Sequence, residues 1–503
     1  MTTTPDPGHE VSTAGGAEAA DHRLHPMSWL FVLLQQLRQF VLPLVAAFFF
    51  GGDRNELWPL IGVGVLALVS VWRYYTYRYG FSGDALVVRS GVLERSVRVI
   101  PFARIHNVAL QQSVLHRLFG VAEVRLESAG GQKPEAEMRV LKLADALALE
   151  ALVRRRPAPD PAVAAPAAEA RVLLALPPRE ILRLGLISNR GLIVVGAAIG
   201  GLSQFNPRLV PDLMERWGEW ALGWASHNGT QDPAFLAVAG LSLALLVVAL
   251  LRLFSIVLAL LQHYGFTLTE TGRRLTVERG LLARWRTSAS RRRIQAWTLR
   301  ETLLHRLLQR RSLDIDTAVA EQHNQQRTLR ELVPVATPAA CDALIEHLLP
   351  RAAWLQLDWR ALPRRAWWRL VLPGLPVALV LTAAAAWFVG PWALLALLWL
   401  PWAAYVARRH MRAAAYAVNA DVIAVREGWW SRHWRFAELD KLQALQLTRN
   451  PLDRRCGTAT LWLDTAGASA LAPPLRIRFL PEAEAAALYA QLARTLARRP
   501  LRW

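Results

Sequence analysis

Six long runs of apolar residues occur along the chain, and they come in three closely spaced pairs. They cover residues 29–50 and 57–75, then 181–202 and 235–261, then 370–389 and 392–406. A helix needs roughly 20 mostly apolar residues to cross a bilayer, so each run is a candidate membrane span. Buried helices of a soluble protein are the alternative. The pairing favours three transmembrane hairpins, over residues 29–75, 181–262 and 368–407.

After each pair, apolar and polar residues alternate in short runs, which is typical of strands with one buried face. The three copies read YGFSGDALVVRSGVL from residue 79, YGFTLTETGRRLTVERGLL from residue 264, and YAVNADVIAVREGWW from residue 416. In each copy a glycine follows the second strand: Gly91, Gly280 or Gly428. A hairpin turn uses glycine where φ is positive. The recurrence predicts one module written three times.

The spacing persists beyond these glycines, because Ile105, Ile294 and Leu442 each stand fourteen residues further on. Further strand-like runs follow, and a helical segment closes each copy. The predicted fold class is therefore an α+β membrane protein, with six transmembrane helices in three hairpins. Each hairpin precedes a β-roll capped by a C-terminal helix. The expected modules cover residues 76–157, 263–350 and 413–497, with a disordered tail at 1–25 and an Ala/Pro linker at 158–176.

The first module carries an ordered set of short motifs over residues 79–130. They are Tyr-x-Phe, Gly-x-Leu, Ile-Pro-Phe-x-Arg-Ile, Gln-x-x-Leu-x-Arg-Leu-Phe-Gly and Ala-Gly. This order resembles the bacterial membrane-flanked pleckstrin-homology-like (PH-like) domain, and the threefold arrangement resembles the YdbT-like membrane proteins. The second module departs from it, with Gln309 at the position of the tight-turn glycine. The resemblance implies PH-like β-rolls and a smaller partner with one similar module. It also implies a role in envelope stress or in tolerance of membrane-active peptides.

The distribution of charged residues along the chain predicts how the protein is oriented in the membrane. The chain has 59 basic and 39 acidic residues, a net charge of +20, and the residues after each apolar pair are rich in arginine. The connection over residues 203–233 is net acidic. Basic loops stay on the cytoplasmic side, so both termini and the modules are expected there, in a bacterial inner membrane. The basic excess also agrees with binding to an anionic membrane surface, whereas nucleic acid is not an expected partner.

Basic residues at equivalent module positions are the candidate interaction sites. His116-Arg117 recurs as His305-Arg306, and Arg454 stands at the third equivalent position. Arginine binds phosphate in a bidentate manner, so these residues, with Arg104, are candidates for contacts with lipid headgroups or other anions. The alternative is a structural turn that the repeat retains.

Enzyme signatures are missing from the sequence. The cysteines, Cys341 and Cys456, stand far apart, and no nucleotide-binding or metal-ligand motif occurs. Asp314 and Asp316 share one face of a predicted strand, which we interpret as two solvated acids. No catalytic residue, cofactor or metal is therefore expected.

Two classes of function remain. The first is a non-enzymatic membrane protein whose modules mediate protein–protein interaction, with lipid headgroups as a further ligand. Its expected partner is a second membrane protein with a similar module, or another copy in a homo-oligomer. The second class is a transporter or export component with a substrate path between the hairpins. Arg38 and Arg252, inside predicted spans, are its best support.

Overall fold

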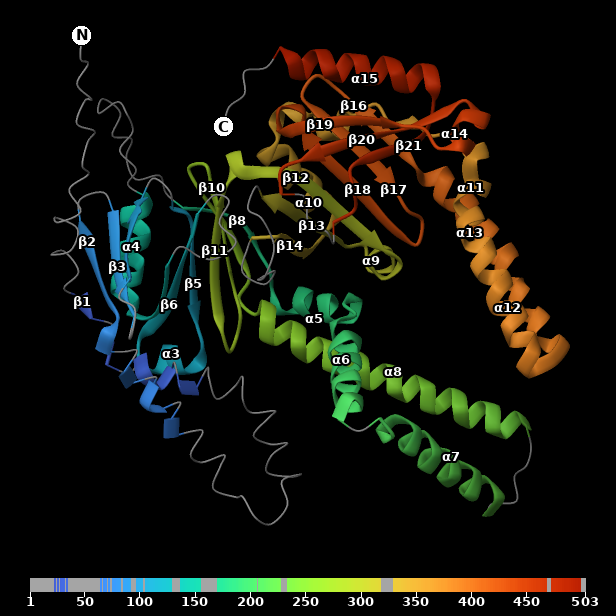
Figure 1. The fold of residues 1–503 in the computed structure, drawn as a ribbon, viewed down its shortest axis with the longest axis horizontal. Coiled ribbons are helices and arrows are strands. Elements are labelled where there is room, and N and C mark those ends of the chain that lie inside the picture. The colour runs from blue at the N-terminus through green and yellow to red at the C-terminus, as the bar shows by residue number, and fades with distance from the viewer. Residues whose placement is uncertain are drawn as a thin grey trace, which may run out of the picture. The chain divides into compact units, whose positions relative to one another are not determined.

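The protein divides into two compact units, and Figure 1 shows their helices and strands. The first consists of residues 1–170, 282–289 and 319–328, and the second of residues 171–281, 290–318 and 329–503. The computed structural model describes residues 22–23, 25–26, 28–31, 33–34, 64–65, 67–69, 71–72, 75–82, 85–91, 96–102, 105–128, 136–154, 170–205, 207–227, 233–317, 329–467 and 472–498.

The first unit holds the first module, which has two antiparallel sheets. One sheet has the order β1-β2-β3-β4, formed by His22–Arg23, Arg78–Ser82, Ala85–Ser90 and Ser96–Pro101. The other contains β5 (Ile105–Gln112), β6 (Val121–Ser128) and β7 (Ala136–Lys142). The short helix α3 (Val114–Leu118) joins β5 to β6, and α4 (Leu143–Arg154) closes the module. Alternate strand residues such as Leu86, Val124 and Leu126 form the core with Leu149 of α4.

The second unit repeats this order for the second module. Here β8 (Arg171–Ala175) pairs with β9 (Thr267–Thr271), which pairs with β10 (Arg274–Arg279). The segments β12 (Ile294–Thr302), α9 (Leu303–Leu307), β13 (Arg311–Thr317) and β14 (Glu331–Ala336) follow. The closing helix is α10 (Pro338–Leu348), whose buried face includes Cys341, Leu344 and Ile345. The intervening strand β11 (Arg284–Ser290) falls almost entirely within the first unit.

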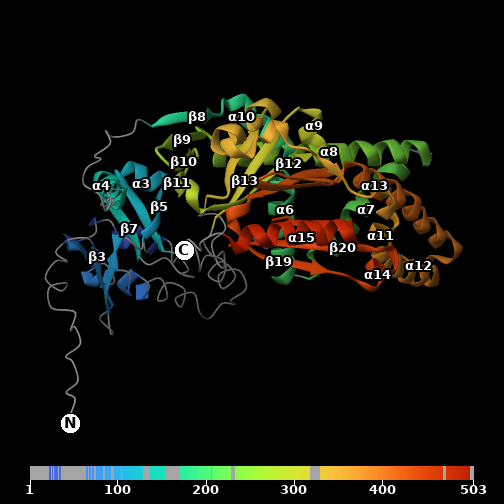
Figure 2. The same ribbon diagram turned by 90° about the horizontal axis from the view of Figure 1, so that it is seen from above.

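The third module has the same plan. Its first sheet contains β15 (Arg360–Ala361), β16 (Ala415–Val418), β17 (Val422–Glu427) and β18 (Ser431–Glu438). Its second sheet contains β19 (Leu442–Thr448), β20 (Thr458–Thr465) and β21 (Arg476–Pro481), with α14 (Pro451–Cys456) between β19 and β20. Helix α15 (Glu482–Ala497) closes the module (Figure 2). Its side chains Ala485, Leu488 and Leu492 lie in the core.

The three hairpin glycines adopt positive φ as expected, at 127° for Gly91, 114° for Gly280 and 92° for Gly428. At Gly428 the requirement is also steric. A Cβ atom there would lie 2.0 Å from the carbonyl oxygen of Ser431. Glycine therefore sets where the second strand ends and the third begins.

The prediction of six transmembrane helices is not supported. Among the described residues, two helices are long and apolar enough to cross a membrane, Ala237–His263 and Arg364–Trp387. The third predicted span is broken into α5 (Pro178–Ile187) and α6 (Arg190–Phe205), bent by 52°. Counted as one span, this pair raises the number to three. The break follows Ser188, whose extended backbone ends α5.

The other predicted spans have different outcomes. The fourth lies within α8 (Pro233–His263), and the fifth includes α12 (Leu375–Val389). The sixth consists of a 3₁₀ helix, Gly390–Leu398, followed by α13 (Trp399–Ala413), whose last turns are rich in arginine. The first two predicted spans and the predicted N-terminal tail lie largely outside the described residues.

Two further elements were not predicted. The end of the expected Ala/Pro linker forms β8, because residues 172–174 are apolar and extend the sheet at β9. The acidic connection between the third and fourth predicted spans contains α7 (Leu209–His227), a helix with Trp217 and Trp220 exposed.

Candidate interaction site

The second and third modules are joined strand to strand. Strand β12 of the second module pairs antiparallel with β18 of the third, from Trp297 opposite Phe436 to Thr302 opposite Ser431. The sheet order β14-β13-β12-β18-β17-β16-β15 therefore runs without a break through both modules (Figure 1). A strand edge offers a row of backbone donors and acceptors, so this pairing satisfies the edges of both sheets.

Aromatic side chains fill one face of this junction. The rings of Trp297 and Phe436 lie parallel, with their centroids 6.2 Å apart, and the ring of Trp354 lies 4.6 Å from that of Phe436. Opposite Leu299, the side chain of Trp434 is also buried. Directly opposed side chains are the unit that stabilises paired strands, and here they are large and shielded from water.

The other face carries buried charge. The Arg435 guanidinium of β18 donates to Oγ1 of Thr298 at 2.6 Å and to the Asp316 carboxylate on β13. The side chains of Arg435 and Asp316 are 3% and 2% exposed. On α9, which follows β12, the Arg306 guanidinium donates to the backbone carbonyl of Trp429 in the third module. Such charges are tolerated away from water only when they are paired and hydrogen-bonded.

A second junction of this kind lies in the first unit. There β11 of the second module pairs antiparallel with β5 of the first module, with Arg284 opposite Gln112 and Arg286 opposite Leu110. Across this junction, Nη1 of Arg286 lies 3.7 Å from the buried carboxylate of Glu150. In both junctions, the first strand of the second sheet of one module (β5 or β12) pairs with the third strand of the following module (β11 or β18).

The two junctions also share one register. Arg284 stands 4 residues after Gly280 and faces Gln112, which is 21 residues after Gly91. Arg432 stands 4 residues after Gly428 and faces Glu301, which is 21 residues after Gly280. Because a shift of one residue would turn every side chain to the opposite face, the repeated register is a property of the module.

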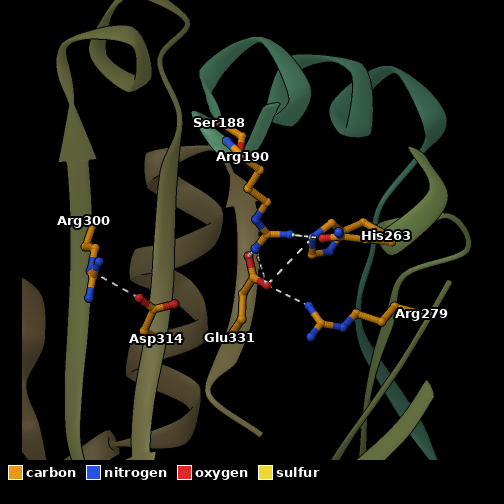
Figure 3. Close-up of polar contacts among 8 residues, drawn as sticks. Ser188, Arg190, His263, Arg279, Arg300, Asp314 and Glu331 are labelled. Atoms are coloured by element: carbon orange, nitrogen blue, oxygen red, sulfur yellow. Dashed lines mark hydrogen bonds and ion pairs between the residues drawn. The ribbon is translucent and has the colours of Figure 1, made fainter. Parts of the chain in front are cut away.

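A polar cluster joins the second module to helices α6 and α8 (Figure 3). The Glu331 carboxylate, at the start of β14, lies 2.7 Å from Nη1 of Arg279 and 3.2 Å from Nη2 of Arg190 on α6. Nη1 of Arg190 also lies 2.7 Å from Nε2 of His263, at the end of α8. Burial raises the pKa of the Glu331 carboxyl, but His263, Arg190 and Arg279 outweigh burial and hold it at about 2. The carboxylate is therefore charged at neutral pH and links both helices to the sheet.

The two predicted histidine contacts occupy equivalent turns and are buried. Nδ1 of His116 lies 2.6 Å from Oγ of Ser113, and Nδ1 of His305 lies 2.8 Å from Oγ1 of Thr302. Each hydroxyl also caps its short helix by accepting the histidine backbone N–H. Burial lowers the pKa of the His305 imidazole, partly offset by the charge of Glu301. His305 is therefore neutral at pH 7, and this geometry favours a structural turn.

The predicted arginine contacts are placed differently from one another. Arg306 binds the third module through Trp429, whereas Arg117 and Arg454 lie exposed on α3 and α14. Arg104 lies outside the described residues. A role of these residues in binding anions stays a prediction.

The interpretation of Asp314 and Asp316 as solvated acids is wrong for Asp316, which is buried against Arg435. Asp314 is also mostly covered, and its Oδ2 lies 3.2 Å from Nε of Arg300 (Figure 3). Burial raises the pKa of Asp314 to about 6, because it outweighs the opposing charge of Arg300. Strand alternation placed both acids on one face, but it could not reveal that Arg435 of the third module reaches Asp316 across β12.

Groups suited to redox or metal chemistry are separated in the structure. Cys341 is buried and Cys456 is exposed, and burial raises the pKa of the Cys341 thiol to about 12. Within the part of the chain that the structure describes, no three His, Cys, Asp or Glu side chains are placed to hold a metal ion.

Comparison with known proteins agrees with the threefold plan. The bacterial PH domain family matches residues 30–157, 231–349 and 370–496. The chain is also 21% identical over 494 residues to the UPF0699 transmembrane protein YdbT of Bacillus subtilis (strain 168), covering 92% of this chain and 96% of that protein. No solved structure matches it significantly. Three matches over most of its length show that the chain belongs to the bacterial PH domain family, as a membrane protein with three such domains.

Proposed function

We propose that the protein is a non-enzymatic, multi-pass inner-membrane protein whose PH-like modules bind other protein modules by pairing strands. The observation that carries this proposal is the β12–β18 junction, where one module holds the next through backbone hydrogen bonds, an aromatic face and a buried ion pair. Strand addition at a sheet edge is a general mode of recognition, with affinity from the main chain and specificity from the side chains.

The membrane helices would hold the modules at the bilayer surface. The arginine-rich segments after each apolar pair support a cytoplasmic position for the modules and both termini. Anionic lipid headgroups are a second class of ligand for the exposed arginines there. The proposed setting is the response of the cell envelope to stress or to membrane-active peptides, following the resemblance to YdbT-like proteins.

Transport is the alternative, and the break between α5 and α6 is the observation that favours it, because transporters place substrates at broken helices. Here Arg252 of α8 occupies the break. Its Nη1 donates to the carbonyl oxygens of Leu186 and Ser188, at 3.0 and 3.1 Å, and to Oδ1 of Asn189 at 3.2 Å. These hydrogen bonds occupy the carbonyl and amide oxygens at the break that a substrate would otherwise bind, which supports a structural role for Arg252.

Affinity purification of the tagged, full-length protein from its native membranes tests the proposal. We expect a membrane protein in stoichiometric amount in mild detergent, either one carrying a PH-like module or an untagged second copy. Proteins captured by a tagged, unrelated multi-pass protein provide the background. A chain that purifies alone, and that remains alone after cross-linking in the membrane, would contradict the proposal.

A further inference from the structure

The third module has a sheet edge that the other two modules use for joining. In the second sheets of the first and second modules, β5 and β12 each pair with the third strand of the following module. The equivalent strand of the third module is β19, at the edge of the sheet β19-β20-β21. No strand in the described part of the chain pairs with its outer side.

The first module has the complementary edge. Its strand β4 is equivalent to β11 and β18, the strands that pair at the two junctions, and it forms the edge of β1-β2-β3-β4. Among the strands of the described residues, only β3 pairs with β4. The side chains of Val97 and Val99 on β4 are 51% and 54% exposed, although β-branched residues are best accommodated against a neighbouring strand.

We infer that β19 of one copy of this chain pairs antiparallel with β4 of a second copy. This inference rests on the proposed function, since it extends the junction between modules to a junction between molecules. Each chain has both edges, β4 in the first module and β19 in the third. The contact is therefore head-to-tail, and repetition would produce a closed ring or a row of copies in the membrane.

The register of the two existing junctions gives the contacts. Trp434 stands 6 residues after Gly428 and faces Leu299, which is 19 residues after Gly280. By the same count, Val97, 6 residues after Gly91, would face Leu447, 19 residues after Gly428. Val99 would then face Leu445, as Phe436 faces Trp297. Two exposed valines would thus meet two leucines that already pack against the core of the third module.

The composition of β19 suits a covered edge. Exposed edges are usually protected from pairing by charged residues, proline or bulges. From Leu442 to Thr448 the strand reads LQALQLT, with neither a charged residue nor a proline. Its register irregularity, between Leu442 and Ala444, recurs at the start of β5 and β12, which pair at the two junctions all the same. A second copy of the chain, with its β4 edge in the matching register, is the occupant that completes this sheet.

Disulfide formation between two differently tagged, full-length copies tests the inference; the copies are co-expressed in cells, and their isolated membranes are then oxidised with copper phenanthroline, because the cytosol keeps thiols reduced. Cys456 is replaced by serine, and Cys341 is retained because it is buried. One copy carries Val97→Cys and the other Leu447→Cys. Directly opposed residues are close enough for a disulfide, whereas diagonal neighbours are roughly 7–8 Å apart. We expect a product carrying both tags for this pair and for Val99→Cys with Leu445→Cys.

Two matched controls define the register and exclude chance collision. Val97→Cys combined with Leu445→Cys shifts the register by two residues, and Val97→Cys combined with the native Cys456 uses an exposed thiol on α14, outside the strand. Both should give at least tenfold less product. Leu447→Glu should abolish the disulfide between positions 99 and 445, and Val97→Lys on the other copy should restore it. Restoration would show that Leu447→Glu had not simply unfolded the module.

The other outcomes separate the two proposals. A disulfide from Leu447→Cys to a different protein would overturn pairing between copies but leave the modules as protein-binding units. A disulfide that forms only within one chain carrying both Val97→Cys and Leu447→Cys would overturn it as well. If no protein is joined to either strand and none co-purifies with the native chain, both proposals fail.

Discussion

Arg435 and Asp316 form an ion pair between modules that is almost entirely removed from water. The Thr298 hydroxyl accepts a second hydrogen bond from Arg435, but it carries no charge. Among the contacts of the described residues, no cation other than Arg435 contacts Asp316. A pair of this kind adds little net stability over well-packed apolar residues, yet it is costly to break. Its main effect is to penalise any other pairing of β12 and β18.

Arg435→Met is expected to lower the free energy of unfolding by about 3–5 kcal/mol, because the Asp316 carboxylate is left buried without a partner. The measurement is unfolding of the purified protein in detergent, followed by tryptophan fluorescence. Arg435→Met combined with Asp316→Leu should recover most of the loss. Equal loss in the single and double variants would contradict this account.

Gln309 ends helix α9 in the left-handed region, at φ +51°, where the equivalent residues Gly120 and Gly457 have φ near the same value. Gln309→Gly should therefore stabilise the second module by about 1 kcal/mol, since a side chain is disfavoured in this conformation. The thermal midpoint of the purified protein provides the test. Gly457→Ala is the matched control and should lower it; a drop in both variants would argue against the assigned conformation.

Ionisation of Asp314 is expected to make the free energy of unfolding fall as the pH rises. Its pKa is about 6 in the fold, against an ordinary value of 3.8 for an aspartate carboxyl in an unfolded chain. The folded protein therefore holds the proton more tightly, and its stability falls as pH rises through this interval. Asp314→Asn should stabilise the protein at pH 7.5 and have little effect near pH 4, measured by chemical unfolding at both values. An equal effect at the two values would exclude ionisation as the cause.

At the scale of elements, the hairpin glycines and the alternating runs predicted the hairpin strands and the closing helices, but not the added strand β8. The partners of β11 and β18 could not be predicted from them. Alternation identifies which face of a strand is buried, but backbone groups at its edges are the same in every sequence. The charged contacts of Arg435 and Glu331 could not be predicted either, because their partners come from distant segments.

The break between α5 and α6 shows why an apolar run alone did not define a span. Ser188 and Asn189 interrupt the run, and Arg252 binds the carbonyl groups that the interruption exposes. Two glycines then allow close packing on α8. A Cβ atom would lie 2.5 Å from Cα of Ile256 at Gly185, and 2.8 Å from the carbonyl oxygen of Leu251 at Gly191.

Gly185→Val should consequently destabilise the packing of α5 on α8 by about 1–3 kcal/mol, the usual cost of excess volume at a close contact. Gly196→Val is the control, because a Cβ atom at Gly196 has no neighbour within 4 Å. The thermal midpoint in detergent distinguishes the two variants. A similar midpoint for both would mean that the close approach at Ile256 does not hold the helices together.

At the scale of the whole molecule, each module is joined to the next by strand pairing as well as by the chain itself. A protease site inserted between Leu357 and Asp358, where the Asp358 side chain is 87% exposed, should therefore give two fragments that stay associated. Co-purification in mild detergent through a tag on one fragment is the measurement. The same cut with Arg435→Met should weaken the association, and separation of the unsubstituted fragments would contradict a stable junction.

The pairing of β8 with β9 has a consequence for how the protein is made. Arg171 faces Glu270 across these strands, and both α6 and α8 are encoded between them. At about 5–20 residues per second, synthesis needs roughly 5–20 s to pass from one strand to the other. The sheet of the second module cannot close before both helices have left the ribosome. The pairing of β8 with β9 therefore follows the synthesis of both helices, and the completed sheet then joins the two ends of the segment that contains them.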